Sequence, residues 1–115
     1  MGTFVISKRQ NGYYKYEFNS RKGKVIFTST DFELRFECEE AIEQLKANVD
    51  QLVFMKFKTS KGKLYFKIIL CDKEIATSRK YSTILLLEKG ISDVIKYAPL
   101  SEYLDFSNQF FEFPN

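Results

Sequence analysis

The sequence predicts a single α+β domain built from two copies of one structural unit. The run FVISKRQNGYYKYEF, which begins at Phe4, is matched at a shift of 50 positions by the run FMKFKTSKGKLYFKI, which begins at Phe54. One residue is lost in the second copy, and the match then continues at a shift of 49 positions and brings Ile42 onto Ile91. Within each copy the apolar period changes from that of a strand to that of a helix, which predicts a sheet layered against helices.

The two copies are expected to form one pseudo-symmetric domain over residues 1–115. A unit of about 50 residues would be marginally stable alone, so the copies should share one hydrophobic core. We place repeat 1 at about 3–50, repeat 2 at about 53–106 and an additional aromatic tail at 107–115.

Three predicted strands open each copy as an antiparallel meander. Asn11 and Gly12 tolerate positive φ, so they predict a tight hairpin turn after the first strand. Residues 13–19 alternate cleanly, with Tyr16 and Phe18 on one face. The predicted strands are 3–8, 13–19 and 24–30 in the first copy and 53–59, 63–71 and 74–78 in the second, with turns at 60–62 and 72–73 and a last strand at 102–106.

One helix is predicted near the end of each copy. In the first, apolar residues recur at spacings of 3, 1, 3 and 4, which forms a stripe along one helix face. Pro99 is expected to end the second helix, because proline cannot continue the hydrogen-bond ladder. The two stripes are Cys38, Ala41, Ile42, Leu45 and Val49, and Leu87, Gly90, Ile91, Val94 and Ala98.

The sequence leaves open which face of the first strand of each copy is buried. Phe4 and Ile6 face one way in the first copy, whereas Met55 and Phe57 have the opposite parity in the second. The second copy also follows the first helix directly, so one strand could serve both units.

The composition is that of an ordinary globular domain. Apolar residues make up 44% and charged residues 29% of the chain, and no apolar run approaches the roughly 20 residues that span a bilayer. The first residues lack the pattern of a signal peptide, so we expect a cytoplasmic protein. Two cysteines without metal-binding spacing predict neither a structural disulfide nor a zinc site.

The residues argue against an enzyme. The chain contains no histidine, which removes the commonest general base and metal ligand. Cys38 aligns with Leu87, so it is interpreted as a small core residue and not as a nucleophile. Glu39 and Glu43 share a helix face, but a solvated face is the simpler interpretation. We expect no catalytic residue, no cofactor and no metal.

Two serines match across the copies at strand ends. Ser29 and Ser78 are expected to satisfy backbone groups with their hydroxyls where each strand turns towards its helix.

Basic hairpins and tyrosines form the one surface that suggests binding. Residues 51–70 contain five lysines and no acid. Rings that stack on bases and cations that meet phosphates are typical of single-stranded nucleic acid binders, although sheets also cover exposed faces with Lys and Tyr to prevent aggregation. The candidate anion or nucleic-acid surface comprises Lys8, Arg9, Tyr13, Lys15, Lys58, Lys61, Lys63, Tyr65 and Lys67.

The order of motifs resembles the YegP-like family of uncharacterised bacterial proteins. The matching elements are NGYYKYEF, GKVIFTS, AIEQLKAN, KGKLYFKI, KEIATS and a helix that ends in YAP, over about residues 3–106. The resemblance implies one antiparallel sheet built from two β-β-β-α-β repeats that exchange their C-terminal strands, with both helices on one face. The chain departs from the family at Ala41, where the family usually has glycine, and in its phenylalanine-rich tail.

The family has no established activity, so the resemblance supplies a fold and leaves the function open. The leading hypothesis is a non-catalytic binding or scaffold domain with an unknown protein partner. The alternative is binding of single-stranded nucleic acid or another polyanion. We expect a monomer or a weak homodimer through the tail, because an exposed cluster of Phe110, Phe111 and Phe113 would reduce solubility unless it docks.

Overall fold

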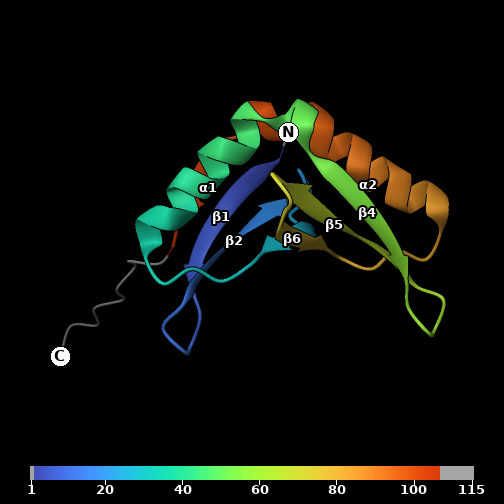
Figure 1. The fold of residues 1–115 in the computed structure, drawn as a ribbon, viewed down its shortest axis with the longest axis horizontal. Helices are drawn as coiled ribbons and strands as arrows, with labels where there is room; N and C mark the ends of the chain where they lie inside the picture. Colours follow the sequence, from blue (N-terminus) through green and yellow to red (C-terminus); the bar gives the residue numbers. More distant parts are fainter. Residues whose placement is uncertain (1, 107–115) are drawn as a thin grey trace.

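The computed structural model describes residues 2–106, which form one mixed seven-stranded sheet covered on one face by two helices (Figure 1). The strand order is β4-β5-β6-β3-β2-β1-β7. The expected docking of the tail concerns residues outside this range. The elements are β1 (Thr3–Lys8), β2 (Tyr14–Asn19), β3 (Val25–Ser29), α1 (Arg35–Ala47), η1 (Val49–Gln51), β4 (Val53–Lys58), β5 (Leu64–Leu70), β6 (Lys73–Ser78), α2 (Ile84–Tyr97), η2 (Ala98–Leu100) and β7 (Tyr103–Asp105).

The two meanders join edge to edge through β3 and β6. These strands pair antiparallel, with Phe27 opposite Ser78 and Thr28 opposite Thr77. Because β3 and β6 each belong to a different half of the chain, their pairing makes one continuous sheet. Both helices then lie over the same face, α1 above the first half and α2 above the second (Figure 1). Neither helix in this part of the chain is long and apolar enough to span a bilayer.

The prediction of a fully antiparallel sheet is wrong at one edge. β7 pairs parallel with β1, with Phe4 opposite Tyr103 and Ile6 opposite Asp105. The chain reaches β7 only after crossing the sheet through α2 and η2, and a helical crossover permits a parallel neighbour that a hairpin does not. Within residues 2–106 no corresponding strand from the first half lies beside β4, because η1 leads directly from α1 into β4.

The turns follow the conformational freedom of their residues. Gly12 and Gly62 have φ of 91° and 86° at the tips of the β1–β2 and β4–β5 hairpins. The β5–β6 turn is centred on Cys71 and Asp72, one residue earlier than predicted. Both have positive φ, 52° and 63°, which matches the right-handed twist of a two-residue hairpin.

The core lies between the helices and the sheet and is rich in aromatic rings. Phe4 and Phe18 pack with their ring centroids 4.7 Å apart, and Tyr16 stacks on Phe32 at 6.2 Å. Burial raises the pKa of the Tyr16 hydroxyl well above its usual value. The predicted helix stripes face this core: Cys38, Ile42 and Leu45 of α1 and Leu87, Gly90, Ile91 and Val94 of α2 are buried.

The structure settles the parity of the first strands. Phe4 and Ile6 of β1 are fully buried on the helix side. The matching residues of β4 are Phe54 and Lys56, which also face that side, but β4 is an edge strand and only Phe54 is partly buried. Met55 and the other odd-numbered residues of β4 therefore lie on the open face.

The two matched serines have the predicted role. Tyr16 N–H donates to Ser29 Oγ at 2.8 Å, and that hydroxyl donates to Thr30 O at 2.8 Å. Ser78 repeats the arrangement, accepting from Phe66 N–H at 2.8 Å and donating to the next carbonyl at 2.7 Å. Each hydroxyl satisfies a buried N–H at the point where a strand leaves the sheet, which explains why both copies carry serine there.

Removing a core side chain from either helix tests whether the two halves unfold together. We expect Ile42→Ala and Ile91→Ala each to lower the free energy of unfolding by about 2–5 kcal/mol, because each leaves a cavity. Ile91 should be nearer the lower value, since 8% of it is exposed and Ile42 is fully buried. Chemical denaturation should show one cooperative transition for both variants, whereas separate transitions of the halves would contradict a shared core.

Candidate functional site

The predicted basic surface does not form one continuous patch. The β1–β2 and β4–β5 hairpins, which carry most of its residues, project from opposite ends of the sheet (Figure 1). Lys15 and Lys67 lie between them on the open face, on β2 and β5.

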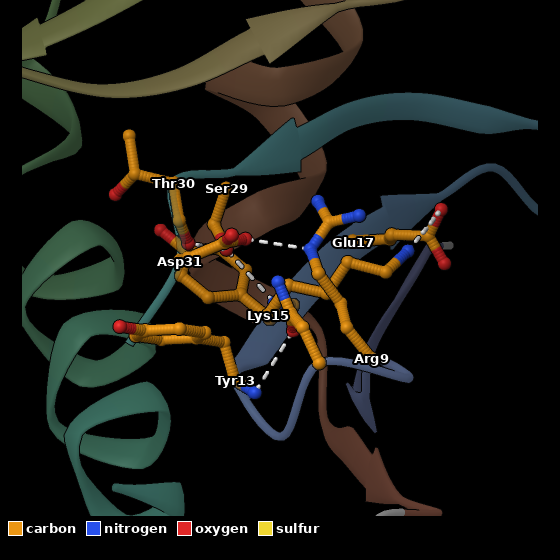
Figure 2. Close-up of polar contacts among 9 residues, drawn as sticks. Arg9, Tyr13, Lys15, Glu17, Ser29, Thr30 and Asp31 are labelled. Atoms are coloured by element: carbon orange, nitrogen blue, oxygen red, sulfur yellow. Dashed lines mark hydrogen bonds and ion pairs between the residues drawn. The ribbon is translucent and has the colours of Figure 1, made fainter. Parts of the chain in front are cut away.

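In the first half, the predicted cations are largely neutralised by neighbouring carboxylates. Figure 2 shows Arg9 reaching Asp31, with 2.6 Å between Nε and Oδ1, and Lys15 beside Glu17 at 3.4 Å. Lys8 Nζ lies 5.6 Å from the centre of the Tyr14 ring. This end of the molecule therefore has little uncompensated charge for a phosphate backbone.

On the open face of the second half, two stacked aromatic rings lie beside one lysine that forms an ion pair. Phe57 and Tyr65 stack with their centroids 5.2 Å apart, and Lys67 Nζ lies 5.7 Å from the Phe57 ring centre. Glu74 Oε1 accepts from Lys67 at 2.9 Å and raises the pKa of that lysine. Each ring covers one face of the other, so less ring area remains for stacking on a nucleic acid base.

Three predicted cations remain at the tip of the β4–β5 hairpin. Lys58, Lys61 and Lys63 are exposed, and none forms an ion pair within the part of the chain that the structure describes. Tyr13 is 41% exposed, at the other hairpin. The nucleic-acid interpretation thus stays a prediction that depends mainly on these lysines.

Cys38 and Glu39, which were considered as a nucleophile and as a metal ligand, are held by burial and by an ion pair. Cys38 is fully buried, and burial raises the pKa of its thiol to about 12. Glu39 is not the solvated residue that we expected, because Arg35 Nη1 donates to its Oε1 at 2.5 Å. The same nitrogen donates to Asp105 of β7 at 2.7 Å. Within residues 2–106, no group of three or more Cys, Asp or Glu is arranged to hold a metal ion.

The outer edge of β4 is a feature that the sequence analysis missed. On the other side of the sheet, Phe4 N–H donates to Glu102 O at 3.0 Å, and Phe106 N–H donates to Ile6 O at 2.9 Å. Phe54 and Lys56 are opposite Ile68 and Phe66 of β5, in the same register that Phe4 and Ile6 have with β2. Their N–H and C=O groups therefore point away from β5, where the described chain provides no further strand.

Exposed apolar side chains flank this edge on both faces. Val53 and Met55 are 55% and 47% exposed on the open face. On the helix side, α2 begins with Ile84, Leu85 and Leu86, whose exposed fractions are 51%, 79% and 47%. The three residues lie within the first turn of the helix.

An ion pair holds the start of α2 beside β4. Glu88 Oε1 accepts from Lys56 Nζ, one helical turn after Ile84. Ile84 occupies the position that matches Arg35 of α1, and Arg35 contacts β7 through Asp105. We call the outer edge of β4, together with the exposed apolar residues beside it, the β4 docking edge. It comprises Val53, Phe54, Met55, Lys56, Ile84 and Leu85.

Comparisons with known proteins agree with this architecture. No protein-family model matches the chain. The UPF0339 protein in the ptx operon 5′ region of Stutzerimonas stutzeri is 23% identical over 109 residues, which cover 93% of this chain and 98% of the relative. The UPF0339 protein YegP of Yersinia pestis is 26% identical and covers 84% of this chain, with 88% of its own length matched.

Solved structures of UPF0339 proteins have the same fold as this chain. The solution structure of YegP from E. coli, described as a protein of unknown function, superposes with a TM-score of 0.83 at 23% identity and covers 95% of this chain and 96% of its own. A UPF0339 protein from Shewanella oneidensis gives a TM-score of 0.80, with 92% of each chain covered and 23% identity. The chain is similar to the YegP proteins in sequence and in fold. The YegP-like resemblance predicted from the motifs is therefore confirmed, and the relatives supply no specific function.

Thiol labelling tests the interpretation of Cys38. Cys71 is exposed and Cys38 is buried, with its pKa raised to about 12. We expect an alkylating reagent at pH 8 to label one thiol of the folded protein and both thiols after denaturation, as counted by intact mass. Equal labelling rates of both thiols in the folded protein would contradict a buried structural cysteine.

A charge reversal tests the nucleic-acid interpretation. If the β4–β5 hairpin binds single-stranded nucleic acid, the triple change of Lys58, Lys61 and Lys63 to Glu should abolish binding of a labelled oligonucleotide at low salt. The affinity of the wild type should also fall steeply as salt is added. Lysine side chains that contact phosphates displace the counterions of the nucleic acid, and added salt opposes that release. Absence of wild-type binding at low salt would remove this interpretation.

Proposed function

We propose that the protein is a non-catalytic interaction domain that binds an extended segment of a partner protein along the β4 docking edge. The observation that carries the proposal is the difference between the two outer strands. β1 is covered by β7, whereas β4 presents the same outward N–H and C=O groups beside exposed apolar side chains. Addition of a strand to such an edge is a recurring mode of peptide recognition.

The internal match of the chain explains how this edge arose. We infer that the two halves are diverged copies of a unit whose final strand covers the first strand of the other copy. β7 is that final strand for the second half and pairs with β1. In the first half the chain passes from α1 through η1 into β4, so residues 2–106 contain no counterpart of β7 for the β4 edge. A partner segment would supply it.

The surroundings of the edge define the chemistry of that segment. Asp105 of β7 forms an ion pair with Arg35 of α1. The matching position of α2, beside β4, is Ile84, which carries no charge. The partner should therefore carry an apolar residue where β7 carries Asp105. Lys56 and Lys58 protect the edge from indiscriminate pairing, as charges on edge strands commonly do. Lys56 already pairs with Glu88, so Lys58 is the cation that favours a segment with an acidic residue.

Apolar contacts should contribute most of the affinity. Each backbone hydrogen bond to the partner adds only about 0.5–1.5 kcal/mol, because it replaces bonds to water. Burial of apolar surface adds about 25 cal/mol per Å², so covering Val53, Met55, Ile84 and Leu85 would exceed the contribution of two or three backbone bonds.

Lys56→Pro and Lys56→Ala form a matched pair that tests the docking edge. The proline removes an outward N–H that β5 does not use, and proline is tolerated at such edge positions. The alanine removes the same side chain and the same ion pair with Glu88 but keeps the N–H. We expect a partner captured from host lysate by the wild type and by Lys56→Ala to be lost with Lys56→Pro, in quantitative pull-down.

Amide hydrogen exchange supplies the second measurement. With the partner bound, the Phe54 and Lys56 amides should become slower to exchange, because they then donate to the added strand. Equal capture by both variants, or unchanged exchange at these two amides in the complex, would contradict strand addition at β4. A wild-type protein that forms a dimer through the same two amides would instead identify the partner as a second copy.

A further inference from the structure

A second feature, separate from the β4 docking edge, is a pocket of about 470 Å³ between the β2–β3 turn and α2. This volume lies within the range of small-molecule sites. Asp93 is the one carboxylate among its lining residues. The wall carries five cations, namely Arg21, Lys22, Lys24, Arg79 and Lys89, and we call this site the cationic pocket.

The cations of this pocket are not compensated. Elsewhere in the molecule, residues such as Arg9, Lys56 and Lys67 pair with carboxylates. Within residues 2–106, none of the five pocket cations does so, and Asp93 forms no ion pair either. Five like charges around one hollow repel one another unless a counter-charge is bound. The arrangement therefore points to an anionic ligand.

The Tyr81 hydroxyl, which makes no hydrogen bond within the described residues, also lines the pocket. Tyr81 is only 8% exposed. The ring is held by stacking on Phe66 and by the Arg79 guanidinium, which lies 5.4 Å from the ring centre. The ring is thus fixed while its hydroxyl lies at the wall of the pocket, where it is free to donate a hydrogen bond to a ligand.

Gly90 is what permits the hydroxyl to lie there. A Cβ at this position would be 2.4 Å from the Tyr81 hydroxyl oxygen, which is a severe clash. In the first half the corresponding pair is Phe32 and Ala41, where no hydroxyl has to be accommodated. A Cβ is therefore accommodated at Ala41, and Tyr81 and Gly90 form a matched pair in the second half.

The fold itself does not require the positive charge. At the opposite end of the molecule, the residues matching Arg79 and Lys89 are Thr30 and Glu40. Both ends share the same bulged strand register, but of the five pocket cations only Lys24 has a cation, Lys73, at its matching position. The charge is therefore a property of this pocket.

The floor of the pocket is apolar because of a β-bulge. The register shift between Phe18 and Asn19 leaves both Ile26 and Phe27 on the buried side of β3. Ile26, Phe18 and Tyr97 then line the pocket below the cations. A ligand would meet charge at the rim and apolar surface at the base.

We propose that the cationic pocket binds a small molecule with two phosphate groups joined to an apolar or aromatic body, such as a nucleoside diphosphate. A nucleoside diphosphate carries roughly three negative charges at neutral pH, which the excess of five cations over one carboxylate can neutralise. The arginine and lysine side chains bind the phosphates, the Tyr81 hydroxyl donates to a phosphate oxygen, and the body packs on Ile26 and Tyr97.

The test is a titration of isotope-labelled protein at low ionic strength, followed by amide chemical shifts. The probes are inorganic pyrophosphate, a nucleoside diphosphate and a single-stranded oligonucleotide with a 5′-phosphate. We expect saturable shifts in residues 20–24, 79–81 and 86–97. The nucleoside diphosphate should bind more tightly than pyrophosphate, because only it has a body for the apolar floor.

Two variants and one control locate the site. Lys89→Glu introduces the residue found at the matching position of α1, and we expect it to lower the association constant roughly tenfold or more. Tyr81→Phe removes only the hydroxyl and should weaken binding several-fold while the remaining spectrum is unchanged. Lys61→Glu makes the same change in net charge on the β4–β5 hairpin and should leave binding within about twofold.

Three results would overturn the proposal. Absence of saturable shifts with both pyrophosphate and the nucleoside diphosphate would show that the pocket takes no such ligand. An equal loss for Lys61→Glu and Lys89→Glu would show that binding is a general charge effect. Shifts in these residues with the oligonucleotide but not with the nucleoside diphosphate would assign the pocket to a nucleic acid strand. None of these results bears on the β4 docking edge.

Discussion

The pairing of β3 with β6 is the constraint on which the rest of the structure depends. It joins the two meanders at their last strands, with Thr28 opposite Thr77, and so makes one sheet from two half-sheets. Because both helices follow these central strands, both lie over the same face and share one core. The same pairing places β4 and β1 far apart, as outer strands of their own halves. The covered β1 edge and the open β4 edge are both consequences of this seam.

The two halves have the same arrangement of strands and helices but different surfaces. The hydroxyls of Ser29 and Ser78 make the same pair of hydrogen bonds, which shows that the strand ends are constrained by the need to satisfy buried backbone groups. Arg35 and Ile84 occupy matching positions, yet one binds a carboxylate and the other is exposed and apolar. Surface positions can differ between the halves because they do not contribute to the shared core, and the proposed docking edge and cationic pocket both lie where the halves differ.

Much of the candidate functional surface could not be predicted from the sequence. Alternation along β2 places Lys15 and Glu17 on one face, so their pairing is local, whereas the pairing of Lys67 with Glu74 depends on the bulged register between β5 and β6. Arg21, Lys22 and Lys24 lie within four residues of one another in the sequence. Their convergence with Arg79 and Lys89 requires the β3–β6 pairing and the crossing of α2, which bring together residues about 60 positions apart.

The sequence by itself determined the elements: strand alternation, turn glycines and helix stripes depend on local periodicity, which a single chain records directly. It also determined the burial of Cys38 and the roles of the two serines, through the internal match. Only the tertiary structure decided that β7 runs parallel to β1, that no strand within residues 2–106 covers the outer edge of β4, and that Tyr81 lies against Gly90. These outcomes depend on which distant segments become neighbours, and no local pattern encodes that choice.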